Sequence, residues 1–158
     1  MTVLSSDNKI NVNSYKELKD RQGREYEELT ENKIFWAFGR EQFDRLLNKL
    51  NLTEEQFCEQ FSKYYGGGFI RKSAIAEVKA LSEKHYKEIQ DMKNNFQFLY
   101  DGLYYEMSNH EMFYSMDYEQ ALSYLGFSVR DTQSNKTLLD AFQKARHDYH
   151  EWCLEHCC

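Results

Sequence analysis

Residues 74–93 read AIAEVKALSEKHYKEIQDMK and form a long amphipathic segment. Its core-facing side chains recur in alternating steps of three and four residues, which predicts a helix with one buried face. These side chains are Ile75, Val78, Ser82, His85, Ile89 and Met92. Because the seam contains Ser82 and His85, we expect a globular helix hairpin or bundle in place of a long coiled coil.

The segments around this helix predict further helices. The chain contains no proline, which favours uninterrupted helical stretches. Thr53 and Gln56 form a capping box that opens a helix in which we expect Phe57, Phe61 and Tyr64 to be buried. Residues 96–107 and 136–155 each predict a helix with an apolar face.

Two interruptions are also expected from the local sequence. Gly23 predicts a break between two short helices, because glycine lowers helix propensity. The polar residues 130–135 predict a loop before the last helix.

The most strand-like segment is residues 34–38, IFWAF, which is short, apolar and stopped by Gly39. A second short strand around residues 68–71 could pair with it. The sequence therefore predicts a mainly α fold, a compact bundle of five to seven helices with one short two-stranded β element around 34–38 and 68–71. Residues 1–13 are expected to be a flexible lead-in, and residues 14–158 a single globular helical domain.

Composition excludes several classes of protein. The net charge of −6 argues against direct nucleic-acid binding through phosphate neutralisation. No run of 18 apolar residues is present, so no membrane partner is expected. The cysteines, Cys58 and three near the C-terminus, do not form a disulfide framework, which favours the cytoplasm. We expect Cys58 to be a small core residue.

Tyrosines gathered between residues 96 and 118 form the first candidate site. They exceed what one helix face can bury, and exposed tyrosines on a rigid helix are good interface anchors. The candidate partner-binding residues are Tyr100, Tyr104, Tyr105, Tyr114 and Tyr118, with the acidic Glu106 and Glu111. The alternative is a tyrosine-rich core whose hydroxyls reach the surface.

Three consecutive glycines form the second candidate site. Gly66, Gly67 and Gly68 precede Arg71 and Lys72, and the long helix begins just beyond them. Backbone amides, two basic side chains and a helix N-terminus can together bind an anionic ligand. The alternative is a tight connection between a strand and the helix.

Two clusters could bind a metal. Glu106 and His110 are four residues apart and would share a helix face, although a cap at the end of that helix is the favoured explanation. Near the C-terminus, His150, Cys153 and Cys157 have helical spacing that suits zinc, although exposed thiols and packing histidines explain them as well. Neither cluster has a standard ligand pattern, so we expect no cofactor.

Three short motifs resemble a family of small uncharacterised proteins found in low-GC bacteria and their phages. The motifs are Phe35-Trp36-Ala37-Phe38, Gly67-Gly68-Phe69-Ile70-Arg71-Lys72, and Tyr105-Glu106 with Asn109-His110-Glu111. The resemblance covers roughly residues 30–128. It carries no established activity, and it implies a phage accessory protein.

We therefore expect a noncatalytic, phage-type accessory protein that binds and inhibits a host or anti-phage defence protein, for example CRISPR machinery. No catalytic residue is predicted, and its location would be the host cytoplasm. One alternative is a small-ligand protein that sequesters a signalling nucleotide at the glycine turn. A second alternative is a metal-dependent enzyme, and the oligomeric state, a homodimer included, stays open.

Overall fold

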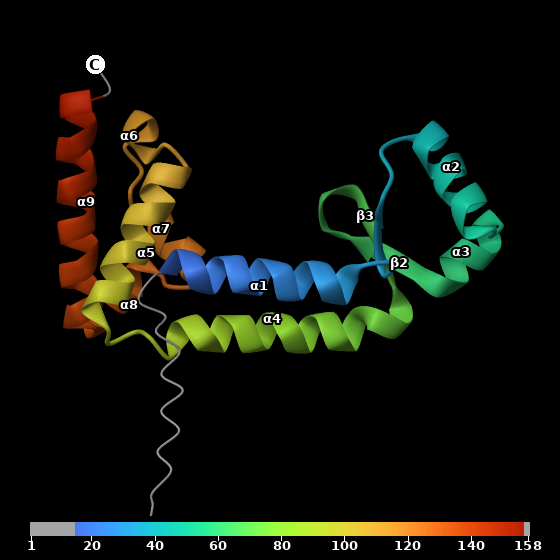
Figure 1. Ribbon diagram of the computed structural model, residues 1–158, viewed down its shortest axis with the longest axis horizontal. Coiled ribbons are helices and arrows are strands. Elements are labelled where there is room, and N and C mark those ends of the chain that lie inside the picture. The colour runs from blue at the N-terminus through green and yellow to red at the C-terminus, as the bar shows by residue number, and fades with distance from the viewer. Residues whose placement is uncertain (1–14, 157–158) are drawn as a thin grey trace, which may run out of the picture. The chain divides into compact units, whose positions relative to one another are not determined.

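The structure is a computed structural model that describes residues 15–156. The chain divides into two compact units (Figure 1). The sheet unit comprises residues 22–85, and the helical unit comprises residues 15–21 together with residues 86–156. The predicted lead-in over residues 1–13 lies outside the described residues. The single domain over residues 14–158 stays a prediction.

Helices α1 (Tyr15–Thr30) and α4 (Ile75–Gln90) each contribute residues to both units. α4 corresponds to the amphipathic helix predicted from residue 74. The predicted break at Gly23 is wrong, because α1 runs through it without interruption. In the sheet unit, the adjacent Gln22 is buried and donates its side-chain amide to the carbonyl oxygen of His85 at 3.1 Å. Such packing outweighs the low helix propensity of one glycine.

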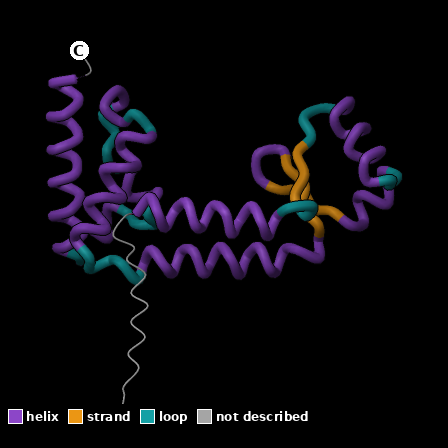
Figure 2. Tube along the Cα trace, viewed as in Figure 1, coloured by secondary structure: helices purple, strands orange, loops and turns teal. Residues whose placement is uncertain are grey.

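Three antiparallel strands form the sheet of the sheet unit (Figure 2). The strands are β1 (Ile34–Trp36), β2 (Phe61–Tyr64) and β3 (Gly68–Arg71). Their spatial order is β1-β3-β2, so that Ile70 of β3 pairs with Ile34 on one side and Ser62 on the other. A short 3-10 turn, η1 (Tyr65–Gly67), joins β2 to β3. A second 3-10 turn, η2 (Lys72–Ala74), leads into α4.

β2 takes the place of the end of a predicted helix. α3 (Glu54–Gln60) begins with the predicted capping box, in which the Thr53 hydroxyl accepts from the Gln56 amide at 3.2 Å. The prediction that this helix continues through Phe61 and Tyr64 is wrong. Phe61 is extended, and its ring packs against Phe35 of β1 at 5.9 Å as well as on Phe57 at 4.3 Å. Aromatic packing across the sheet therefore favours a strand over one more helical turn.

Helices cover both faces of the sheet. α2 (Arg40–Leu50) and α3 pack on the face that carries Phe35, Phe61 and Phe69. The opposite face packs against the end of α1 and the start of α4. Its apolar side chains are Tyr26, Leu29, Ile34, Tyr64, Ile70, Ala74 and Val78. The small sheet is thus an apolar centre between two helical layers of the same unit.

Helices α5 (Phe96–Asn109) and α9 (Lys136–His156) are the longest elements lying wholly within the helical unit. Leu99, Leu103 and Met107 of α5 recur every four residues and are completely buried. They share one core with the buried face of α9. Three short helices complete the unit, namely α6 (Met112–Ser115), α7 (Gln120–Tyr124) and α8 (Val129–Ser134).

α8 lies where a loop was predicted over residues 130–135, and that prediction is wrong. Ser128 accepts from the Asp131 amide, and the Asp131 carboxylate accepts from the Ser128 amide at 2.7 Å. This capping box satisfies backbone groups that would otherwise be unpaired at the start of so short a helix. Thr132 is buried, and its hydroxyl donates to the Val129 carbonyl at 2.6 Å.

The predicted fold class, mainly α with one small β element, is confirmed. The described residues contain nine α-helices and three strands, against the five to seven helices and two strands expected. The additional elements are the short ones, in which tertiary contacts decide the conformation more than sequence periodicity does. None of the helices in residues 15–156 combines the length and apolar character needed to cross a membrane.

Candidate functional site

Aromatic side chains surround the glycine turn between β2 and β3. Gly66 and Gly67 have φ values of +67° and +87°, which favour glycine. A Cβ atom at Gly67 would lie 2.9 Å from the Phe38 ring, and one at Gly68 would lie 2.9 Å from the Trp36 ring. The glycines therefore let two aromatic rings lie directly on the turn.

This arrangement produces an exposed aromatic surface, which we call the hairpin patch and define as Trp36, Phe38, Tyr64 and Tyr65. The exposed fractions are 51% for Trp36, 62% for Phe38 and 84% for Tyr65. Tyr64 links the patch, because its ring contacts both Trp36 at 6.3 Å and Tyr65 at 5.3 Å. Large exposed side chains held on a short turn are typical of protein-binding surfaces.

A groove lies next to the hairpin patch, between β2 and α4, with a volume of about 620 Å³. Buried Ile70 and Val78 are among its apolar residues, and Ile75 is partly exposed. Its charged lining residues are two lysines, and no acidic side chain lines it. The full lining is Ser62, Lys63, Tyr64, Tyr65, Ile70, Ile75, Val78, Lys79 and Ser82. We call this feature the β2 groove.

The structure does not bring the predicted anion-binding residues together. Arg71 stands at the opposite end of β3 from Gly68, donates to the Asn32 carbonyl at 2.8 Å, and stacks over the Phe61 ring. Lys72 donates to the Cys58 carbonyl at 3.1 Å. Both basic side chains thus donate hydrogen bonds to backbone carbonyls within the sheet unit, while aromatic rings cover Gly67 and Gly68. Anion binding at this turn stays a prediction.

Three of the predicted partner-binding tyrosines lie together on α5. Tyr100, Tyr104 and Tyr105 are half-buried and line a shallow hollow with Asp101 and Ser108. Tyr100 is also held from within, because its hydroxyl donates to Asp148 at 2.7 Å. Burial, with the hydrogen bond to Asp148, raises the pKa of Tyr100. These tyrosines belong partly to the packing of α5 on α9.

The remaining residues of that predicted surface divide between surface and core. Tyr114 is 72% exposed and Glu111 is exposed, so both are accessible. Tyr118 is buried, and its hydroxyl lies 2.7 Å from Nδ1 of His150. Glu106 is also buried. The structure therefore places Tyr118 and Glu106 inside the helical unit.

Glu106 is the centre of a buried polar network. Its carboxylate accepts from the Tyr15 hydroxyl at 2.7 Å and lies 3.1 Å from Nε2 of His110. Glu106 and His110 do share a helix face, and the imidazole stacks on Tyr124 at 4.0 Å. Burial raises the pKa of Tyr15, and the hydrogen bond to Glu106 raises it further. The network links α1 to α5. Because α5 ends at Asn109 and His110 is its C-cap residue, the position of His110 agrees with a structural role at the helix end.

The predicted C-terminal metal ligands are only partly described. Cys153 is buried, and His150 lies against Tyr118. Cys157 lies outside the described residues, so metal binding by this cluster stays a prediction. Cys58 is exposed on α3, and its predicted core position is wrong. The helix directs the preceding Phe57 to the sheet, which turns Cys58 outward.

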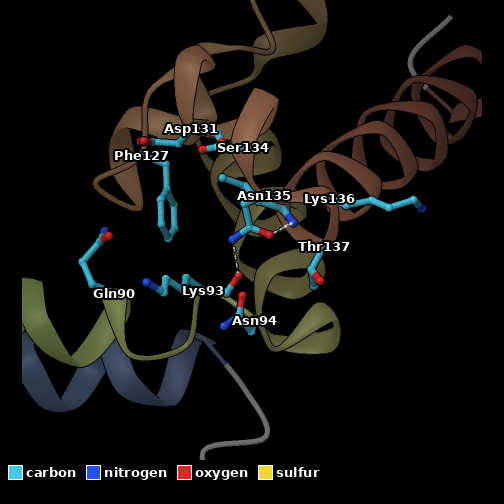
Figure 3. A pocket seen from close by; sticks show the side chains of 10 residues that line it. Gln90, Lys93, Asn94, Phe127, Asp131, Ser134, Asn135, Lys136 and Thr137 are labelled. Carbon is cyan, nitrogen blue, oxygen red and sulfur yellow. Dashed lines mark hydrogen bonds between the residues drawn. The ribbon is translucent and has the colours of Figure 1, made fainter.

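A second hollow, of about 590 Å³, lies at the start of α9 (Figure 3). Asn135 caps α9 by accepting from the Leu138 amide at 3.1 Å, and it donates to the Lys93 carbonyl at 2.8 Å. In Figure 3, Phe127 points into this hollow and Lys136 points away from it. Both polar groups of the Asn135 side chain are therefore already hydrogen-bonded at the start of α9.

Sequence reasoning missed the hairpin patch and the β2 groove. The sequence predicts Trp36 and Phe38 as strand residues and the three glycines as part of an anion-binding turn. The signal that points to the patch is the predicted pairing of the aromatic strand 34–38 with a strand that begins at Gly68, because glycine accommodates large rings from the neighbouring strand.

A protein-family model, described as a family of unknown function, DUF7659, matches residues 14–148. The match covers most of the chain, so the chain belongs to this family. It includes the hairpin patch and the β2 groove and ends before His150. Comparison with curated proteins and with solved structures gave no match. The chain thus belongs to an uncharacterised family, as expected, whereas the link to phages stays a prediction.

Proposed function

We propose that this member of the DUF7659 family is a noncatalytic binding protein that captures a partner protein through the hairpin patch. The observation that carries the proposal is the exposure of Trp36, Phe38 and Tyr65 around one turn. Monomeric proteins seldom expose several large aromatic side chains side by side without a partner for them. Tyrosine and tryptophan also dominate the energetics of many protein interfaces.

The rigidity of the turn supports the same proposal. Trp36 lies in β1 and pairs with Gly68 of β3, so the sheet fixes its backbone. Phe38 rests on Gly67, and its amide donates to the Gln42 side chain at 2.8 Å. Side chains that are already ordered lose less conformational entropy on binding.

The finer part of the proposal is that the partner is a host or anti-phage defence protein, for example CRISPR machinery, and that the chain is a phage accessory protein acting in the host cytoplasm. It is supported by the three motifs that resemble proteins of low-GC bacteria and their phages. The net charge of −6 adds support, because it disfavours nucleic acid as the direct target. Two of the motifs, residues 35–38 and 67–72, meet in the sheet that carries the hairpin patch.

A pull-down comparison tests the placement of the binding surface. The full chain, tagged at its N-terminus, is incubated with lysate of a low-GC bacterium, and the captured proteins are quantified by mass spectrometry. Tyr65→Ala is expected to lower recovery of a stoichiometric partner at least about tenfold, as loss of an aromatic anchor does. Tyr114→Ala is the matched control, because Tyr114 is similarly exposed in the helical unit.

The two outcomes have distinct meanings. Loss of the partner with Tyr65→Ala alone supports the hairpin patch. Equal recovery with both variants, or loss with Tyr114→Ala alone, refutes it. For the finer proposal, the chain is expressed in a bacterium with an active CRISPR system, where phage plating should rise. Unchanged plating contradicts inhibition of that system.

A further inference from the structure

We propose that the β2 groove binds an extended acidic segment of the partner protein, which adds as a further strand along the free edge of β2. This inference rests on the proposed function and names the chemistry of the partner. It requires an open strand edge, an apolar surface beside that edge, and charges that select the segment. The sheet unit provides all three.

The open edge follows from the register of the sheet. β2 has β3 on one side and, among the described residues, no strand on the other. In an antiparallel ladder, backbone groups of successive residues point alternately to the two sides. Arg71 directs its N–H to the Lys33 carbonyl at 2.8 Å, so Ile70 directs its groups to Ser62 of β2. Lys63, the next residue, therefore turns its N–H and C=O to the open edge.

The groove presents this edge to solvent. Four consecutive residues, 62–65, line one side of it, as happens when the backbone edge of a strand faces the hollow. The other side is α4, which contributes Ile75, Val78 and Ser82. An added strand could therefore place alternate side chains against Tyr64, Ile75 and Val78 while its backbone pairs with Lys63.

Charge selects the kind of segment. Lys63, at the edge of β2, and Lys79, on α4, are the charged residues of the groove lining, and no aspartate or glutamate lines it. Lys63 pairs with Phe69, so its side chain extends on the sheet face opposite Ile70, where it would meet every second side chain of an added strand. Among residues 15–156, Lys63 has no ion-pair partner, and Lys79 is 4.0 Å from Glu83, at the limit of an ion pair. This basic groove stands out on a chain of net charge −6. The segment that fits has branched apolar residues alternating with aspartate or glutamate.

A peptide selection tests the proposal directly. The full chain is panned against a display library of random linear peptides, and enriched peptides are measured by fluorescence anisotropy. Enriched peptides are expected to be acidic and rich in valine, isoleucine or threonine. The double variant Lys63→Glu with Lys79→Glu should weaken their binding at least about tenfold, as should the exposed groove variant Ser82→Trp. Added peptide should also slow hydrogen exchange at the Lys63 amide.

The matched control is the double variant Lys87→Glu with Lys136→Glu, which makes the same charge change on exposed lysines of the helical unit. It should bind the peptides within about twofold of the unchanged chain, because neither Lys87 nor Lys136 lines the groove. Absence of enriched peptides, enrichment of peptides without acidic residues, or equal binding by Lys63→Glu with Lys79→Glu overturns the inference.

This failure is distinguishable from failure of the proposed function. If Tyr65→Ala prevents partner capture while the charge reversal changes neither capture nor peptide binding, the hairpin patch stands and the strand addition fails. If capture does not depend on Tyr65, the proposed function itself fails.

Discussion

Replacing two helical glycines by alanine should change the stability of the protein in opposite directions. A methyl group at Gly23 of α1 would meet no atom within 4 Å. At Gly102 of α5 the same methyl group would lie 2.8 Å from the Tyr15 ring and 3.0 Å from Leu125. Contacts this short require one of the neighbours to move.

The magnitudes follow from two opposing effects. Alanine gains about 1 kcal/mol over glycine inside a helix, and this gain applies at both positions. Overpacking a buried site costs about 1–3 kcal/mol. The cost at Gly102 should be near the upper end, because Glu106 holds the Tyr15 hydroxyl and Leu125 is buried. We expect Gly23→Ala to stabilise by about 0.5–1 kcal/mol and Gly102→Ala to destabilise by about 1–2 kcal/mol.

Urea unfolding followed by far-ultraviolet circular dichroism measures both changes in the free energy of unfolding. In thermal unfolding, each kcal/mol should shift the melting temperature by about 2–4 °C. A destabilising Gly23→Ala would mean that the chain leaves helical geometry at residue 23. A stabilising Gly102→Ala would mean that the Tyr15 ring is not pressed against α5. Either result would refute the packing described above.

Three further predictions concern other side chains. Tyr15→Phe should destabilise by about 1.5–3 kcal/mol in urea unfolding, because buried Glu106 loses a donor, and a loss below about 0.5 kcal/mol would contradict the network. Burial raises the pKa of Tyr26 from 10.0 to about 12, so its contribution to stability is complete below pH 10 and is lost as the pH rises toward 12. A urea midpoint that is constant over this range would contradict that shift. Maleimide labelling read by peptide mass spectrometry should modify exposed Cys58 in the native protein and buried Cys153 only after unfolding, and equal rates would contradict their burial.

Features set by local chemistry could be predicted from the sequence. The capping box at Thr53 requires only residues three positions apart, and the amphipathic face of α4 repeats every three to four residues. The fold class follows from the same periodicity and from the absence of proline.

Features that depend on distant partners could not be predicted in this way. Phe61 continues a helical pattern, yet its ring packs on Phe35 across the sheet, and the sequence holds no local record of that contact. The tyrosines that follow α5 differ for the same reason. Tyr118 packs against Tyr149 of α9 and is buried, whereas Tyr114 of α6 is exposed. The hairpin patch likewise depends on the pairing of Trp36 with Gly68.

The strand order β1-β3-β2 also fixes the sequence of events in which the sheet can assemble. β2 and β3 are joined by only three residues, so they can pair by closing a short loop. β1 pairs with β3 and has no ladder to β2. During synthesis on the ribosome, β1 therefore emerges long before its partner exists, and α2 and α3 are made in the interval. The aromatic residues of β1 therefore have no partner strand until the glycine turn and β3 have been translated.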